Sequence, residues 1–555
     1  MAPNTRPLRT CGGFYCIEKG YLKIMSDTQA DVINQAAYLY VGAQTGAGKT
    51  YHSIGEIKRY LEGGGNVLYA APTHVLLDQF HEDLVGAFIS NVVRIDSSDD
   101  DNDDASGKRR LRIREAVELE MAEVGCGLSG TGKVLLITHD ALFSLENVDY
   151  QKQYHLIVDE APKAFISTSI SLGKGADMLD AELYLRMLDR SNSQDVKAIY
   201  GHKETFKKSA TGSRDCSELT RSKEFRQLAR HVLSDVMEVE VLNPNATTSL
   251  NFISYRSSKA LQGYKSVTIM SANFEDTFLY LLWKGQGIAF KEVCLKGFDK
   301  SPKGHLHHSG SVQIYYMFDR NFTLGSHVSN PRVMGEVLRC VQDLFNGLGR
   351  GGHDGYVYAL NDRVVVPDFL KGSKMPVVSY GLNKWIGYDC VFYGAATNLD
   401  NTAVASLGQR GVNREQINIA LKGQNAYQSV TRVSVRERGS HGDNRDMHLV
   451  VTDKQIADYL GSLFHDSRVT KIGDFDELEG GESGRPSNKY NDADYRRAKS
   501  VISRNQKGVG PLPGQITWAE SKGYNEGTAI VLANLVRQYF DDKEAAASEW
   551  GPVLS

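Results

Sequence analysis

Residues 37–50, AYLYVGAQTGAGKT, form the stretch of sequence that decides the fold. An apolar run typical of a buried strand ends in a glycine-rich turn, and apolar residues then recur at helical spacing from Lys49 to Leu61. A strand, a glycine-rich turn and a helix in this order are the setting in which many proteins bind phosphate groups. The sequence therefore predicts a phosphate-binding loop at the carboxyl end of a strand.

The residue types in this loop suit a triphosphate with its metal ion. Gly46 and Gly48 let backbone N–H groups turn toward a phosphate, because no Cβ stands in the way. Lys49 supplies a positive charge, Thr50 offers a hydroxyl to Mg²⁺, and the helix N-terminus adds a partial positive charge. We expect ATP with Mg²⁺ to be bound by Ala43, Gln44, Thr45, Gly46, Ala47, Gly48, Lys49 and Thr50.

Short apolar runs alternate with helical stretches in two blocks of the chain. In the first block, residues 37–290, further strand-like runs occupy residues 66–72, 133–138, 155–160 and 266–272. In the second block, residues 291–465, they occupy residues 355–360, 376–381, 389–395 and 447–453. This alternation predicts an α/β protein with two parallel-sheet lobes that carry helices on both faces.

Other segments depart from this alternation. Residues 165–262 show no strand rhythm and are expected to form a mostly helical insertion in the first lobe. Residues 1–36 are an N-terminal segment, residues 466–490 a polar linker, and residues 491–555 a helical C-terminal accessory domain. Within that domain, residues 511–540 suit a helix-turn-helix unit, for which DNA binding and docking of a protein partner both stay open.

The bulk composition fits a globular protein of several domains. A chain of 555 residues exceeds one core, and 41% hydrophobic with 24% charged residues are ordinary values. No apolar run is long enough to cross a membrane, and the seven scattered cysteines include no CxxC pair. We expect a cytoplasmic or nucleoid- or nuclear-associated protein in a reducing compartment, not a secreted one. With a net charge of −3, any basic surface must be local.

A second chemical element is LIVDEAP, residues 156–162, in which an apolar run ends in two adjacent carboxylates. Asp159 is placed to hold Mg²⁺ directly or through water. Glu160 is then free to orient and deprotonate an attacking water. The pair predicts hydrolysis of the γ-phosphate rather than nucleotide binding alone.

The ordered motifs resemble those of superfamily 2 helicases of the DEAD/DEAH-box-like type, whose first motif also commonly begins with alanine. The matching stretches are AQTGAGKT (43–50), APTHVLLDQ (71–79), THDAL (138–142), DEAP (159–162), SAN (271–273), SYGLNKWIGYD (379–389) and QSVTRVSVR (428–436). The resemblance implies two tandem RecA-like lobes with ATP in the cleft between them. It also implies that the third and fifth motifs couple ATP state to nucleic acid, through Ser271, Ala272, Asn273, Gly387 and Asp389.

Two departures from the family pattern concern residue roles. Asn273 replaces the threonine of the third motif, which puts the coupling role of that position in question. The last arginine of the sixth motif stands eight residues after Gln428, one later than the commonest spacing, so Arg432 and Arg436 are both arginine-finger candidates. A finger from the second lobe would stabilise the γ-phosphate charge only when the lobes close. Gln428 is expected to orient the water or touch the γ-phosphate.

Nucleic-acid contacts are expected where strands of the first lobe end. Thr73, His74, Thr138 and His139 lie in the two backbone-contact motifs. For His139, a buried hydrogen-bonded histidine is an equal alternative. Basic residues of the insertion, including Lys203, Lys207, Lys208, Arg221 and Arg226, form either a strand-gripping surface or a solvated helix face. His305, His307 and His308 lack partners at metal-ligand spacing and are expected to be loop residues.

These observations together predict an ATP-dependent helicase or translocase. The expected partner is nucleic acid, DNA rather than RNA, as a single strand or fork, with protein partners possible at the C-terminal unit. Replication, recombination or repair is the expected setting, by analogy at the level of the fold. A nucleic-acid-stimulated ATPase switch or RNA remodeller without processive unwinding, and a catalytically silent binding scaffold, are the alternatives.

Overall fold

The computed structural model describes residues 14–18, 21–25, 37–95, 113–125, 132–145, 149–171, 185–188, 196–201, 223–242, 249–293, 310–323, 327–328, 330–378, 384–436 and 445–475. The chain divides into two units, Met1–Phe475 and Asp476–Ser555, and all of these residues belong to the first. The accessory domain predicted for residues 491–555 and the histidines at 305–308 lie outside the described residues. None of the helices in the described ranges combines the length and apolar character that a membrane span requires.

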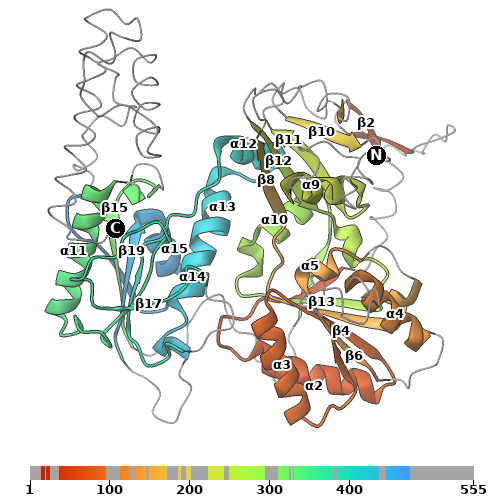
Figure 1. Ribbon diagram of the computed structural model, residues 1–555, viewed down its shortest axis with the longest axis horizontal. Helices are drawn as coiled ribbons and strands as arrows, with labels where there is room; N and C mark the ends of the chain where they lie inside the picture. Colours follow the sequence, from red (N-terminus) through yellow and green to blue (C-terminus); the bar gives the residue numbers. More distant parts are fainter. Residues whose placement is uncertain are drawn as a thin grey trace, which may run out of the picture. The chain divides into compact units, whose positions relative to one another are not determined.

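The first lobe contains a seven-stranded parallel sheet in the order β14-β3-β13-β7-β4-β6-β5 (Figure 1). Its strands are β3 (Tyr38–Val41), β4 (Asn66–Ala71), β5 (Val92–Arg94), β6 (Val134–Thr138), β7 (Tyr154–Asp159), β13 (Ser266–Met270) and β14 (Phe290–Glu292). Its helices are α2 (Lys49–Glu62), α3 (His74–Gly86), α4 (Ile113–Gly125), α5 (His139–Leu142) and α10 (Phe278–Gly285), with 3-10 turns η2 (Asp149–Gln153), η3 (Ser258–Leu261) and η4 (Phe274–Asp276).

This sheet is buried on both faces, which explains the continuous apolar runs of its strands. All six residues of β4 are buried. Leu68 and Ala70 face one hydrophobic cluster, whereas Val67, Tyr69 and Ala71 face another. Successive side chains of a strand point to opposite faces, so the two clusters lie on the two sides of the sheet.

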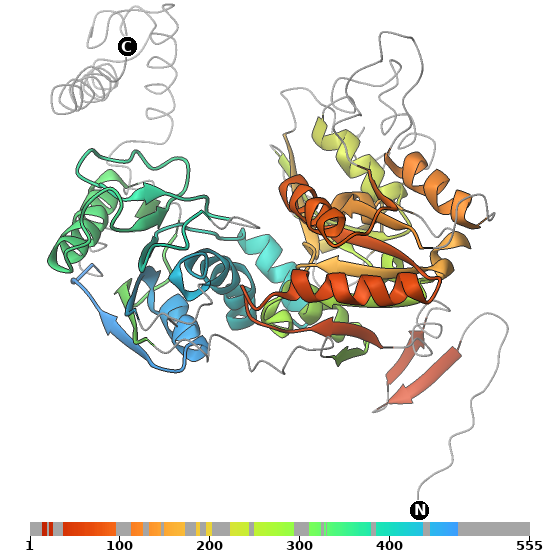
Figure 2. The same cartoon turned by 90° about the horizontal axis from the view of Figure 1, so that it is seen from below.

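The second lobe contains a six-stranded parallel sheet in the order β17-β16-β18-β19-β15-β20. Its strands are β15 (Val312–Phe318), β16 (Val357–Ala359), β17 (Ser373–Lys374), β18 (Cys390–Tyr393), β19 (Met447–Asp453) and β20 (Ser467–Lys471). Its helical elements are α11 (Pro331–Gly347), α12 (Asn401–Gln409), α13 (Arg414–Asn418), η6 (Ile419–Gly423), α14 (Gln424–Val430), η7 (Ser434–Arg436) and α15 (Lys454–Leu463). Helix α11 covers one face of this sheet, and α14 and α15 cover the other (Figures 1 and 2). The prediction of two parallel-sheet lobes is confirmed.

Two local predictions in the second lobe are wrong. The stretch expected as a linker, residues 466–490, begins with β20, which pairs with β15 as an edge strand. The strand expected at residues 376–381 is absent from its described part, residues 376–378, and the short β17 precedes it instead.

In the first segment of the chain, β1 (Phe14–Glu18) and β2 (Tyr21–Met25) form an antiparallel pair.

In the part that the structure describes, the insertion is a sheet, which corrects the prediction that residues 165–262 are mostly helical. Strands β8 (Phe165–Ser171), β9 (Leu185–Leu188), β10 (Val196–Gly201), β11 (Met237–Leu242) and β12 (Ser249–Arg256) form an antiparallel sheet in the order β8-β12-β11-β10-β9. One helix, α9 (Lys223–Leu233), packs on it through Phe225, Leu228 and Ala229. Apolar and polar residues alternate in MEVEVL (237–242): Val239 and Val241 pack in the cluster that contains α9, whereas Glu238 and Glu240 contact the α12 segment. Such strands lack continuous apolar runs.

Helix α12 connects the second lobe to this insertion. Ser406 Oγ of α12 lies 2.7 Å from Glu240 Oε2 of β11 and 2.5 Å from the Tyr255 hydroxyl of β12. Arg410, which follows α12, binds Glu240 Oε1 at 2.5 Å and Glu238 Oε2 at 3.2 Å. The guanidinium also stacks over the Tyr255 ring, 3.7 Å from its centroid. Helix α12 and the following Arg410 thus contact the insertion through hydrogen bonds, ion pairs and a cation–π contact.

Candidate nucleotide site

The phosphate loop has the backbone shape that its glycines predict. Gly46 and Gly48 adopt φ values of 72° and 88°, in the left-handed region that glycine enters without strain. Gly48 is the N-cap of α2, so the loop passes directly into a helix N-terminus. Lys49 is buried, and its Nζ donates to the carbonyl oxygens of Ala43 at 2.9 Å and Gln44 at 3.0 Å. The lysine therefore reaches back across the concave side of the loop.

The acidic pair lies at the carboxyl end of β7. Asp159 is buried and accepts a hydrogen bond from the Tyr69 hydroxyl at 2.8 Å. Burial and the neighbouring Glu160 raise the pKa of Asp159 to about 6, while Tyr69 and the charge of Lys49 act in the opposite direction. Glu160 has a φ of 61°, a conformation rare for a non-glycine residue and often found at functional sites.

The third motif lies against this pair because β13 is the neighbour of β7, with Met270 paired to Asp159. The Glu160 N–H donates to the Met270 carbonyl at 2.8 Å, and Ser271 Oγ lies 3.4 Å from Glu160 Oε2. Ala272 packs in the hydrophobic cluster of the second lobe. Asn273, with a φ of 48°, places Nδ2 at 3.4 Å from the Tyr459 hydroxyl of α15.

Helix α14 and the residue that follows it bring the sixth motif to the first lobe. Gln428 Nε2 donates to Glu160 Oε2 at 3.3 Å. The Thr45 N–H donates to the Tyr427 hydroxyl at 3.3 Å, and the Thr45 hydroxyl donates to Thr431 Oγ1 at 2.7 Å. One short helix therefore contacts both the phosphate loop and the acidic pair.

The structure describes the side chain of only one of the two arginine-finger candidates, Arg432 and Arg436. Arg432 is buried, one helical turn after Gln428 and next to Thr431. Arg436 ends the 3-10 turn η7, and its side chain lies outside the described part of the chain. Arg432 is the candidate whose surroundings are described.

The fifth-motif residues are held within the second lobe. Asp389 is buried and forms an ion pair with Arg350, with Nη2 and Oδ2 separated by 2.6 Å. Gly387 is exposed, and its carbonyl accepts a hydrogen bond from Arg445 at 3.4 Å. Unlike Asn273, these two residues have no hydrogen bond to the other lobe among those the structure describes.

The residues predicted to touch nucleic acid lie at one edge of the first sheet, where Ala71 of β4 pairs with Thr138 of β6. Thr73 and Thr138 are N-caps whose hydroxyls accept from the N–H groups of Leu76 and Ala141. His74 is exposed. His139 is buried instead, its Nε2 lies 2.9 Å from the Asp159 carbonyl, and burial with the Arg256 charge lowers its pKa to about 3. The buried alternative therefore holds for His139, which is removed from the surface.

Four residues that form hydrogen bonds at the candidate site lie outside the sequence motifs, so the sequence did not identify them. They are Tyr69, Gln424, Tyr427 and Tyr459. Gln424 and Gln428 are four residues apart, so helical spacing alone would place them on one face. Tyr69 and Tyr459 reach the site only through the tertiary fold, which local sequence does not reveal.

The donor set fits Mg²⁺ and a triphosphate. Carboxylate and hydroxyl oxygens, here from Asp159 and Thr50, are ligands that Mg²⁺ prefers, with water and phosphate oxygens completing its shell. The positive charge of a divalent cation would lower the pKa of Asp159, which burial raises. Gln44 Oε1 and Gln428 Oε1 are buried and have no hydrogen-bond partner among the described residues, so the cleft has polar groups still to satisfy. The described ranges contain no cluster of three or more His, Cys, Asp or Glu ligands, so a metal site made of protein groups alone is not found there.

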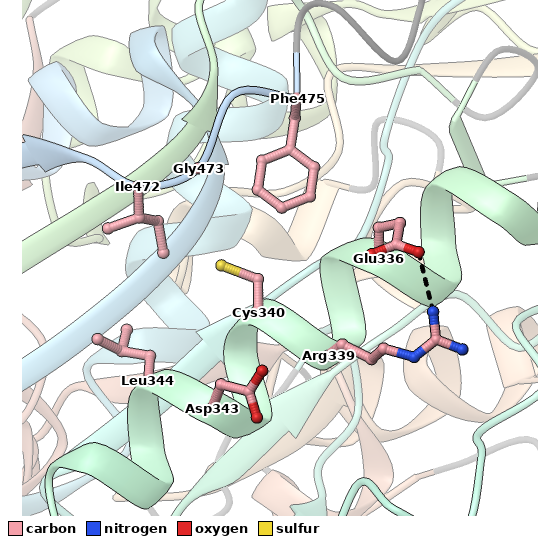
Figure 3. Close-up of a pocket in the computed structure, with 8 residues that line it drawn as sticks. All are labelled: Glu336, Arg339, Cys340, Asp343, Leu344, Ile472, Gly473 and Phe475. Carbon is pink, nitrogen blue, oxygen red and sulfur yellow. Dashed lines mark hydrogen bonds and ion pairs between the residues drawn. The ribbon is translucent and has the colours of Figure 1, made fainter.

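A separate hollow lies in the second lobe, between α11 and the segment after β20 (Figure 3). It has a volume of about 490 Å³ and is lined by Glu336, Arg339, Cys340, Asp343, Leu344, Ile472, Gly473 and Phe475. It contains no residue of the motifs described above.

Residues 19–177 match the family described as "Type III restriction enzyme, res subunit", a match that reaches from β2 to beyond β8. A search of the curated proteins finds no match. Among solved structures, the chain is similar to Xpd4 of S. tokodaii at 11% identity and a TM-score of 0.41, covering 80% of this chain and 98% of that one. It is also similar to a Dbp5 variant of S. cerevisiae bound to RNA and ADP BeF3, at 11% identity and a TM-score of 0.30, covering 81% and 91%. The matched residues include the phosphate loop and the acidic pair, and together with the order of the motifs and the two parallel sheets they make the chain similar to the superfamily 2 helicases.

Proposed function

We propose that this protein hydrolyses Mg²⁺-ATP and uses the reaction to move along nucleic acid and to unwind it. The observation that carries the proposal is the position of α14, which contacts the phosphate loop through Tyr427 and the acidic pair through Gln428. A helix of the second lobe held at both places would be displaced when a γ-phosphate enters or leaves. Hydrolysis would thereby change the relation between the lobes.

The proposed chemistry is in-line attack of water on the γ-phosphate. Lys49 and the loop N–H groups would hold the phosphates, and Thr50 and Asp159 would hold Mg²⁺, which neutralises charge on the phosphate oxygens. Glu160 would accept the proton of the attacking water, with Gln428 holding its carboxylate in place at 3.3 Å. Arg432 is proposed as the finger, because its side chain lies one turn from Gln428.

DNA is proposed over RNA as the track, and replication, recombination or repair as the setting. The insertion and the further C-terminal residues support this reading only by analogy, since they exceed what a minimal RNA remodeller carries. Thr73, His74 and Thr138, together at one edge of the first sheet, are proposed to contact the backbone.

The test is an ATPase assay with single-stranded DNA, duplex DNA, RNA or no nucleic acid. Stimulation by one of these ligands is expected, and Lys49→Ala should abolish turnover. Lys58→Ala, which removes an exposed lysine from the same helix, is the matched control and should behave as wild type. A rate that no nucleic acid changes would refute the proposal.

A strand-displacement assay with a labelled duplex then separates unwinding from an ATPase switch that does not unwind. A scaffold without turnover is disfavoured because the sequence retains Lys49, Asp159 and Glu160. ATP-dependent displacement of the labelled strand is the expected result.

A further inference from the structure

The hydroxyl group of Tyr459 joins polar side chains from both lobes. Tyr459 lies on α15 and is buried. Its hydroxyl donates to Asp276 Oδ2 at 3.0 Å and accepts from Gln424 Nε2 at 2.7 Å and from Asn273 Nδ2 at 3.4 Å. A phenol offers one donor and two acceptor positions, so all of its hydrogen-bonding capacity is used. Asn273 and Asp276 belong to the first lobe, whereas Gln424 and Tyr459 belong to the second.

The backbone before α14 is shaped to admit the Tyr459 ring. The π-helical turn η6, Ile419–Gly423, directly precedes α14. A Cβ at Gly423 would lie 2.8 Å from Cδ1 of the Tyr459 ring, closer than real Cβ contacts allow. Single π-helical turns inside helices are frequent at functional sites. The glycine and the turn therefore serve the same close approach.

Asn273 suits this contact better than the family's threonine would. Its φ of 48° and ψ of 46° are left-handed, a conformation that asparagine tolerates and a β-branched residue does not. The donor atom of asparagine also stands one bond further from the backbone than the hydroxyl of threonine. The departure from the family pattern thus comes with a contact that threonine could not make.

We propose that Tyr459 is a positioning residue, which transmits the nucleotide-dependent placement of α14 to the segment Asn273–Asp276. The inference rests on the proposed function. Helix α14 touches Thr45 through Tyr427 and Glu160 through Gln428, and its first residue, Gln424, touches Tyr459. A shift of α14 therefore moves the partner of the Tyr459 hydroxyl, and the hydroxyl in turn holds the end of the third motif.

The test compares Tyr459→Phe with wild type. This variant keeps the ring and removes the three hydrogen bonds. Two coupling values are measured: the factor by which single-stranded DNA stimulates ATPase, and the factor by which a non-hydrolysable ATP analogue tightens DNA binding. Both factors should fall about tenfold, within the usual range of coupling between sites. Tyr315→Phe is the matched control, because among the described residues that hydroxyl hydrogen-bonds only to His448 of its own lobe, and both factors should stay at the wild-type value.

Two further variants guard against misfolding of Tyr459→Phe. Asn273→Gly keeps the left-handed backbone and removes the amide, and Gly423→Ala displaces the ring while keeping the hydroxyl. Each should lower the same two factors, and Tyr459→Phe with Asn273→Gly should be no worse than the stronger single change, as expected for one shared contact.

The outcomes separate the two ideas. Wild-type protein whose ATPase no nucleic acid stimulates overturns the proposed function. Wild-type protein that is stimulated, with correctly folded Tyr459→Phe and Asn273→Gly variants that keep both factors within about twofold, overturns the role of Tyr459 alone.

Discussion

Replacing Arg410 with alanine should loosen the attachment of α12 to the insertion. The Arg410 and Glu240 side chains are 15% and 9% exposed, so the pair is largely removed from water. Removing one partner of a buried pair costs about 3–5 kcal/mol, because the other charge stays buried without compensation. Glu240 keeps its hydrogen bond from Ser406 at 2.7 Å, and Glu238 is 38% exposed. We therefore expect the lower end of that range, about 3 kcal/mol.

Hydrogen–deuterium exchange measures this local opening directly, which matters because a chain of several domains does not unfold in two states. At about 1.4 kcal/mol per factor of ten, 3 kcal/mol corresponds to roughly 10²-fold faster exchange in peptides from residues 401–409 and 237–242. Arg339→Ala is the matched control. Its pair with Glu336 is exposed on both sides, at 59% and 45%, so its own helix should change by less than about 1 kcal/mol.

A double variant tests the electrostatic reasoning itself. Arg410→Met with Glu240→Met removes both charges and keeps much of the volume, so it should protect α12 better than Arg410→Ala does. A rise in exchange of less than about fivefold in Arg410→Ala, which corresponds to about 1 kcal/mol, would show that the buried ion pair does not hold α12 on the insertion. Faster exchange in the double variant than in Arg410→Ala would show that packing, and not charge, dominates this attachment.

Three further predictions concern the nucleotide site. Glu160→Gln should lower kcat for ATP by about 10²–10⁴ while a fluorescent ATP analogue still binds; a kcat within threefold of wild type would contradict the role as base. The pKa of Asp159 is raised to about 6, so its carboxyl takes up a proton as the pH falls through that value. Because a protonated carboxyl is a poor Mg²⁺ ligand, kcat/KM for Mg²⁺-ATP should decline at that pH. A kcat/KM that stays constant from about pH 7 to about pH 5 would argue against Asp159 as a ligand. The folded-state pKa of His139 is lowered from 6.5 to about 3, so the stability that depends on its neutral ring is complete above pH 6.5 and is lost as the pH falls. Thermal midpoints at about pH 7 and pH 5 should therefore differ more in wild type than in His139→Gln, and equal differences would exclude His139 as the cause.

The strands of both parallel sheets could be predicted because strands that are buried on both faces consist of consecutive apolar residues. The runs at residues 66–72 and 133–138 correspond to β4 and β6, and that at residues 447–453 to β19. The insertion could not be predicted in this way. Its strands alternate in polarity, and β8 pairs with β12 across most of the insertion, with Phe165 opposite Tyr255. Such pairing depends on distant residues, which a local pattern does not contain.

The candidate site likewise contains residues that local sequence predicts and residues that only the tertiary fold brings in. The phosphate loop and the acidic pair are local motifs, and the structure places Lys49 and Asp159 close enough for the lysine charge to act on the carboxyl pKa. Their catalytic roles stay predictions. The tyrosines at 69 and 459 come from a strand and a helix whose sequences look like ordinary core segments, so only the folded chain shows what their hydroxyls touch.

The strand order of the first sheet also sets the order in which this site can be built during synthesis. Among the described strands, β3, which leads into the phosphate loop, pairs with β13 and β14 only, and both are made after the entire insertion. A nascent chain that ends before residue 266 has the loop sequence but neither neighbour for its strand. Protein synthesis generally lets N-terminal domains fold first. Here the N-terminal loop must wait for a partner strand encoded more than two hundred residues downstream, so the nascent lobe gains its nucleotide-binding shape only after the ribosome has passed the insertion.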